Sequence, residues 1–334
     1  AILCRIYVEA DQPNDAIALM EDPKIGSLTL VKKNDPAVDR EGMASEVYTT
    51  ALLAYFGALP DAANAQSLFT KAEATMDGLN STVGKDAEGQ QKLIGIYVTL
   101  AEQVKEMIER APAAKRKTLT QVFATFLDRV AKTGTDFPVL SWVAENFYQL
   151  GQANDPGGGE PPADVKAFYA KAEEQYTALI EKGKSDESVS TNMVMQLRVR
   201  LANVLRRQGK YVLAMDQMEE VLKDPKRNST LDLQVAAAEM YMEWAESELG
   251  IDRLYLRAIN GGRKNAARKN NIWGWVTMSK RLAAQIERSP ELKDRFYETL
   301  HTAKVKQAES YYNYAMTLEG EERDLCQGLC LAFA

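Results

Sequence analysis

Apolar residues recur along most of the chain at intervals of three and four positions. The clearest run is Leu93, Ile94, Ile96, Tyr97, Leu100, Val104 and Ile108, and residues 51–56 and 119–130 follow the same spacing. An α-helix completes a turn in about 3.6 residues, so this spacing places the apolar side chains on one face. The pattern therefore predicts amphipathic helices over nearly the whole chain.

Alternation of apolar and polar residues, the pattern typical of strands, is almost missing. The nearest case is Ser27-Leu28-Thr29-Leu30-Val31, which is short and has no second strand to pair with, so we expect a loop or irregular turn there. Gly- and Pro-rich turn signals divide the helices, and the longest, residues 152–162, holds three glycines and three prolines and predicts a flexible loop or linker. The expected fold class is all-α.

Composition narrows the function classes only a little. The chain has 334 residues, of which 46% are hydrophobic, and its 41 basic and 47 acidic residues give a net charge of −6, which argues against a dedicated nucleic-acid binder. No apolar stretch approaches the ~18 residues of a membrane span. The first residues do not resemble a signal peptide and look like the interior of a helix, which leaves a fragment and a processed product of a longer protein as two open interpretations, and no compartment is assigned.

One short pattern occurs four times along the chain. A small residue is followed three positions later by a large apolar residue, and four positions after that by Gly or Ala. The four sets are Ala144, Phe147 and Gly151; Ala202, Leu205 and Gly209; Ala238, Tyr241 and Ala245; and Ala308, Tyr311 and Ala315. We expect the small residue to admit a neighbouring helix closely and the glycine to let the chain turn.

These positions resemble the tetratricopeptide repeat (TPR), a unit of two helices and about 34 residues. Residues 196–225 fit best, through Ala202, Leu205, Gly209, Tyr211, Ala214, Met218, Val221 and Pro225. The resemblance covers about half of the chain and implies an α-solenoid, a right-handed superhelix of stacked helical hairpins. It divides the chain into degenerate hairpins over 1–136, where the alignment places residue 1 inside a first helix; two TPR-like repeats over 137–225, with an insertion at 152–162; and irregular repeats over 226–334.

The resemblance also implies a binding groove lined by the first helix of each repeat. The corresponding residues are Glu145, Tyr148, Asn203, Arg206, Glu239, Met242, Glu309 and Tyr312. Asn203 and Arg206 resemble half of a clamp for a peptide carboxylate, although a solvated arginine beside a helix-pairing asparagine is the simpler interpretation. Three of the four positions carry Glu instead, so we expect a mixed, partly acidic and aromatic groove.

A second candidate surface is the stretch 253–286, which has eight basic residues and no acidic one. Its patch is Arg257, Arg263, Lys264, Arg268 and Lys269, with Trp273 and Trp275 close by. An anion-binding module for an acidic protein, a nucleic acid or a polyanionic glycan would use such a patch. The simpler interpretation is a solvated loop, with the tryptophans packed in the core.

Catalytic, cofactor and metal motifs are not evident. Cys326 and Cys330 stand four apart without a partner histidine, so small buried hydrophobes are expected there rather than a zinc site. His301 is a lone histidine, typical of packing or surface positions. Adjacent acids such as Glu173-Glu174 are common on helix surfaces and do not face each other.

The sequence thus favours a non-enzymatic protein–protein interaction scaffold that needs no cofactor and binds a protein or peptide in a groove of the solenoid. The alternative is the anion-binding module, and a carboxylate-based hydrolase on a helical superstructure comes third. Exposed apolar faces at the two ends would favour end-to-end self-association or a place within a longer chain.

Overall fold

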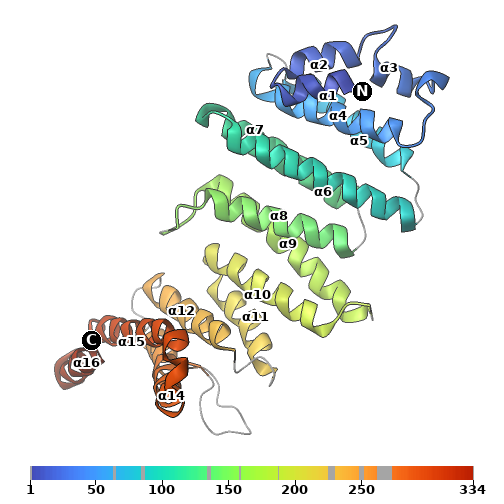
Figure 1. Ribbon diagram of the computed structural model, residues 1–334. Coiled ribbons are helices and arrows are strands. Elements are labelled where there is room, and N and C mark those ends of the chain that lie inside the picture. Colours follow the sequence, from blue (N-terminus) through green and yellow to red (C-terminus); the bar gives the residue numbers. More distant parts are fainter. Residues whose placement is uncertain are drawn as a thin grey trace. The chain divides into compact units, whose positions relative to one another are not determined.

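The computed structural model describes residues 2–62, 65–83, 87–133, 137–157, 159–186, 188–224, 230–247, 252–261 and 273–333. These residues form α-helices, short 3₁₀ turns and connecting loops, with no strand among them, so the predicted all-α fold is confirmed. The chain divides into two compact units, residues 1–139 and 140–334, and each is described by itself (Figure 1). The first unit ends near the expected boundary at 136, and the second contains both of the other expected segments.

The first unit contains seven α-helices among its described residues. They are α1 (Ile2–Glu9), α2 (Pro13–Met20), α3 (Ser27–Lys32), α4 (Met43–Ala58), α5 (Ala65–Thr82), α6 (Ala87–Arg110) and α7 (Ala113–Thr133), with short 3₁₀ turns at Pro36–Val38 and Leu59–Asp61. The central helix is α4, which packs against α1, α2, α3, α5 and α6. Its long apolar segment, which includes Leu52, Tyr55 and Phe56, is accordingly buried almost completely.

Aromatic and polar contacts attach the other helices to α4. Phe126 of α7 makes edge-to-face contacts with Phe56 of α4 and Tyr97 of α6, with ring centroids 5.9 and 5.7 Å apart. The Tyr55 hydroxyl donates a 2.6 Å hydrogen bond to Glu21, whose other carboxylate oxygen accepts a bond of 2.6 Å from Lys71 of α5. These contacts hold α4 against α7 through Phe56, and against α5 and the residue after α2 through Tyr55.

The expectation of a loop at residues 27–31 is wrong. This segment forms α3, a helix of 6 residues that begins after Gly26. Leu28 and Val31, three positions apart, are both buried on the side that packs against α2 and α4. Tertiary packing therefore outweighs the strand propensity of a short segment that contains β-branched residues.

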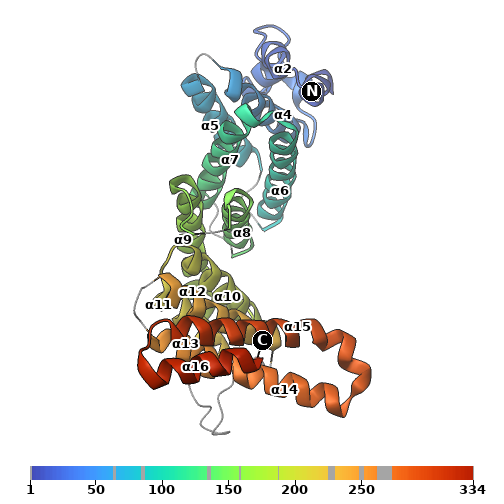
Figure 2. The same ribbon diagram turned by 90° about the vertical axis from the view of Figure 1, so that its left-hand side faces the viewer.

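In the second unit most helices pack against the helix that follows them in the chain (Figure 2). Its described helices are α8 (Phe137–Asn154), α9 (Ala163–Ser185), α10 (Thr191–Arg207), α11 (Tyr211–Lys223), α12 (Leu231–Ser247), α13 (Asp252–Asn260), α14 (Trp275–Arg288), α15 (Lys293–Ala315) and α16 (Gly320–Phe333), with a 3₁₀ turn at Pro290–Leu292. The helices α10 and α11, which carry the best-fitting repeat, form an extensively packed hairpin. Ala202, Leu205, Ala214, Met218 and Val221 are all buried in it or beside it.

Two glycines of the recurring pattern have different roles. Gly209 has a φ of +71° and lies in the turn between α10 and α11, where we expected the chain to reverse. Gly151, expected in a turn as well, lies inside α8. A Cβ atom at Gly151 would lie 2.5 Å from the ring of Tyr169, so the missing side chain makes room for an aromatic ring of α9.

The loop after α8 is anchored by a nearly buried carboxylate, Asp155. Arg207 donates two hydrogen bonds of 2.7 and 2.6 Å to it, and the Tyr169 hydroxyl donates a third of 2.9 Å. The hydrogen bonds from the Arg207 guanidinium are the main reason that the pKa of Asp155 falls from 3.8 to about 2. Burial alone would raise this pKa, and the backbone N–H of Gly157 lowers it further. One residue of the expected flexible loop thus connects the ends of α8 and α10 to the middle of α9.

None of the helices described in either unit is both long enough and apolar enough to cross a membrane.

Candidate functional site

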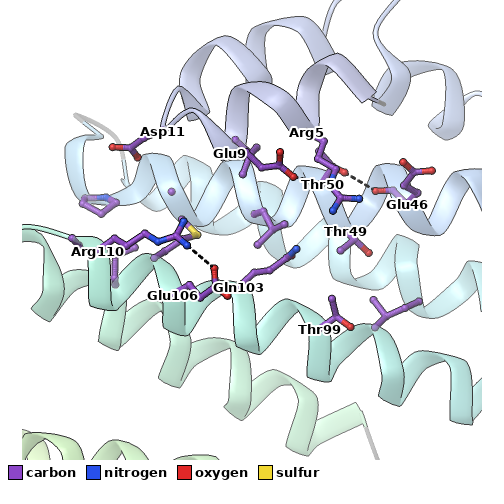
Figure 3. Close-up of a pocket in the computed structure, with 18 of the residues that line it drawn as sticks. Arg5, Glu9, Asp11, Glu46, Thr49, Thr50, Thr99, Gln103, Glu106 and Arg110 are labelled. Atoms are coloured by element: carbon purple, nitrogen blue, oxygen red, sulfur yellow. Dashed lines mark hydrogen bonds and ion pairs between the residues drawn. The ribbon is translucent and has the colours of Figure 1, made fainter.

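A cavity of about 700 Å³ lies in the first unit, between α1, α4, α6 and the start of α7 (Figure 3). Its size falls within the range typical of ligand sites, ~300–1,000 Å³. In Figure 3, α4 lies behind the cavity, α1 lies above it and α6 lies below it, so the cavity follows the exposed side of α4. The two proline-containing segments around Pro60 and Pro112 close one end.

Three helical stripes line the cavity. Those of α4 and α6 repeat every three to four residues, which is the spacing of one helix face. The lining positions are Glu46, Thr49, Thr50, Leu53 and Gly57 on α4; Ile96, Thr99, Gln103, Met107 and Arg110 on α6; and Arg5, Val8 and Glu9 on α1. Thr50 and Leu53, which are only 5% and 7% exposed, form the floor of the cavity. Their side chains are small or apolar. At Gly57 an added Cβ would lie 3.0 Å from the end of Met107, so glycine allows α4 and α6 to approach closely there.

Charged side chains surround the opening. Arg5 pairs with Glu9 at 3.0 Å along α1, and Arg110 pairs with Glu106 at 3.1 Å along α6. Lys115 pairs with Asp61 at 2.5 Å, and its carboxylate partner raises the pKa of the ammonium group. The three cations at this opening are therefore already neutralised by carboxylates of their own chain.

The hydroxyl groups of the cavity are committed to helix backbones. Ser45 donates to the carbonyl of Gly42, Thr49 to that of Ser45, Thr50 to that of Glu46 and Thr99 to that of Gly95, at 2.8, 2.8, 2.9 and 3.0 Å. The described residues that line the cavity include no histidine or cysteine.

Among the described residues that line the cavity, Gln103 has a buried side-chain oxygen without a hydrogen-bond partner. Its side chain extends from α6 along the cavity (Figure 3), and its Oε1 atom is buried without a hydrogen-bond donor. An unpaired buried acceptor costs roughly 1–3 kcal/mol. Such a group needs a physical reason, and a ligand that donates a hydrogen bond is one.

Sequence reasoning missed this cavity. The lining stripe of α6 lies beside the apolar run that predicted the helix, and it looks like an ordinary solvated face because Thr99, Gln103, Glu106 and Arg110 are polar. No local signal distinguishes a polar stripe that faces water from one that faces a cavity. The difference depends on α1 and α4, which are distant in sequence.

The groove residues expected from the TPR resemblance lie on α8, α10, α12 and α15 of the second unit. The Tyr176 hydroxyl donates a 2.9 Å bond to Glu145, and Arg200 of α10 lies 3.4 Å from the same carboxylate oxygen. The guanidinium of Arg200 also lies over the ring of Tyr148, 5.2 Å from its centroid. Tyr148 itself is only 5% exposed, so α9 and α10 cover most of its surface.

The arginine of the expected half-clamp, Arg206, already has a partner within the protein. Arg206 donates a 2.6 Å hydrogen bond to Glu243 of α12, so its guanidinium connects two helices. Glu239, one turn earlier on α12, makes no ion pair among the described residues, and burial raises its pKa despite the nearby charge of Arg206. These contacts bring residues of α8, α10 and α12 together in one charged row.

The remaining predicted groove residues differ in accessibility. Met242 is buried, and its sulfur accepts a 3.2 Å hydrogen bond from the indole N–H of Trp275. On α15, Glu309 is exposed and pairs with Lys306 at 2.8 Å, and Tyr312 is 52% exposed. Only the α15 end of the row thus offers a large side chain to a partner.

Most of the predicted basic patch, namely Arg263, Lys264, Arg268 and Lys269, lies outside the described residues. Arg257 is exposed on α13. Trp273 and Trp275 are 3% and 0% exposed, so their rings pack inside the protein and are not available to a partner. The anion-binding alternative stays a prediction.

The cysteines and the histidine considered above as metal or catalytic residues do not gather in one site within the described residues. Cys326 is a buried free thiol as expected, Cys330 is only half-buried, and His301 is exposed on α15. In the part of the chain that the structure describes, no three His, Cys, Asp or Glu side chains gather in a way that could hold a metal ion.

Comparison with protein-family models, curated proteins and solved structures finds none that matches this chain. Any function must therefore be inferred from the chemistry of its own surfaces.

Proposed function

We propose that this protein is a non-catalytic interaction scaffold of TPR-like helical hairpins, and that the cavity of the first unit binds a segment of a partner protein. The observation that carries the proposal is the cavity itself: about 700 Å³ lined by three helical stripes. Pockets of this size with an apolar floor and a few polar groups are the usual form of binding sites. The committed hydroxyl groups favour binding over chemistry.

The test is a selection for peptides that bind the wild-type chain, followed by measurement of each on two variants. Thr99→Trp places a large ring at the exposed wall of the cavity, and Tyr312→Ala removes an exposed aromatic ring of the other unit. The selected peptides should bind wild type and Tyr312→Ala equally and should bind Thr99→Trp at least about tenfold more weakly, because the indole occupies the space they need. Thr99→Ser is the matched control that keeps the cavity open.

Peptides that bind Thr99→Trp as tightly as wild type would rule out the cavity as the site. If the same peptides were lost with Tyr312→Ala, the contact surface would instead be the exposed face of α15. That face has a specific observation in its favour: Val305, Tyr312 and Met316, spaced seven and four residues apart, are 40%, 52% and 54% exposed. An apolar stripe of this kind is typical of a contact with another protein.

A further inference from the structure

The length of the cavity indicates the form of its occupant. The lining residues of α4 extend from Ser45 to Gly57, and those of α6 from Ile96 to Arg110. At 1.5 Å per residue these stretches are about 18 and 21 Å long, which is between three and four turns of an α-helix. A helix placed along α4 would find apolar groups, among them Leu53, Ile96 and Met107, at the spacing of its own face.

The hydrogen-bonding groups of the wall select for a donor. Four hydroxyl groups have already donated their hydrogens to backbone carbonyls, so each presents only an oxygen lone pair to the cavity. The buried Oε1 of Gln103 is a further acceptor without a donor. The backbone N–H groups of a bound helix are used within that helix, so its Lys, Arg or Gln side chains would supply the donors for this wall, whereas a carboxylate or phosphate supplies none.

The charges of the opening select for a cation. Arg5, Arg110 and Lys115 each have a carboxylate partner at ion-pair distance. Asp11 adds to the negative field at Lys115 without being its ion-pair partner, and Glu46 forms no ion pair among the described residues. Both are exposed lining residues, and Figure 3 shows them at opposite ends of the cavity. After the three cations are matched with their carboxylate partners, Asp11 and Glu46 leave one negative charge at each end of the opening.

We propose that the occupant of this cavity is a basic amphipathic helix of a partner protein, with an apolar face over Leu53, Ile96 and Met107 and Lys or Arg side chains directed to Asp11 and Glu46. This inference rests on the proposed function and adds the chemical class of the segment that is bound. The apolar face supplies most of the affinity, and the two carboxylates supply selectivity for charge.

Three labelled peptides test the charge requirement by fluorescence anisotropy on the full chain. Each has about 15 residues, the same apolar face with leucine at positions 1, 5, 8 and 12, and Lys, Gln or Glu on its flanks, with helicity matched by circular dichroism. We expect the Lys peptide to bind about tenfold more tightly than the Gln peptide, and the Glu peptide to bind most weakly. The preference should shrink as salt is added.

The matched variant is Asp11→Asn combined with Glu46→Gln. Asparagine tolerates the φ of +56° at position 11, and Glu46 is exposed, so the fold is expected to survive. The double variant should lose the preference for Lys over Gln while it keeps the affinity for the Gln peptide.

The outcomes separate the two proposals. Equal affinity for the three peptides, or a preference that survives in the double variant, overturns the basic-helix inference while binding that is sensitive to Thr99→Trp still supports the cavity. Binding that Thr99→Trp leaves unchanged overturns the proposed function itself.

Discussion

Neutralising Asp155 should destabilise the second unit by about 2 kcal/mol. The change is Asp155→Asn, which keeps the size of the side chain but removes the charge that accepts two hydrogen bonds from Arg207. The pKa of Asp155 is lowered from 3.8 to about 2, and one pKa unit corresponds to about 1.4 kcal/mol. Because the side chain of Asp155 is only 6% exposed, solvent screens this interaction little. The variant also leaves Arg207, 19% exposed, without its counter-charge.

The assay is urea unfolding followed by tryptophan fluorescence. All four tryptophans, at positions 142, 244, 273 and 275, belong to the second unit, so the signal reports that unit alone. The matched control is Glu181→Gln in the same unit, which removes an ion pair with Lys184 whose side chains are 63% and 52% exposed. The control should cost less than about 1 kcal/mol, because solvent screens an exposed pair.

The sign of the pH dependence gives a second check. A carboxyl whose pKa is lowered by folding stabilises the folded state above its unfolded pKa and loses that contribution as pH falls through the folded pKa. The difference between wild type and Asp155→Asn should therefore be constant above about pH 5 and narrow between pH 4 and 2. Equal urea midpoints at pH 7, or a difference that stays constant down to pH 3, would refute the reasoning.

Two further changes test the packing described above. Gly151→Ala should lower the free energy of unfolding by about 1–3 kcal/mol in the same urea assay, because its Cβ would meet the buried ring of Tyr169 at 2.5 Å. Gly209→Ala should lower it by about 1 kcal/mol, through its φ of +71° alone. A larger loss at Gly209 than at Gly151 would contradict this assignment. Gln103→Leu should stabilise the first unit by about 1 kcal/mol in thermal unfolding followed by circular dichroism, since it removes a buried acceptor without a donor, and unchanged or lower stability would show that this oxygen is satisfied in solution.

The helices themselves could be predicted from the chain. The spacing of Leu93 to Ile108 and of Leu119 to Val130 corresponds to α6 and α7, and the pattern around Gly209 corresponds to the α10–α11 turn. These features depend on residues three to eight positions apart, so the information lies within each segment. The segment Ser27–Val31 is a helix although its sequence predicts a loop. Its helical state depends on the burial of Leu28 and Val31 by α2 and α4, which the segment itself does not reveal.

The candidate site, in contrast, was decided by tertiary structure. The polar stripe of α6 becomes a cavity wall only because α4 and α1, about 50 and 90 residues earlier, face it across an open space. In the same way Tyr148 and Met242, at predicted groove positions, are buried by Arg200 and Trp275 from other helices. Helix periodicity states which side chains share a face, but the neighbour of that face is chosen by packing between segments distant in sequence.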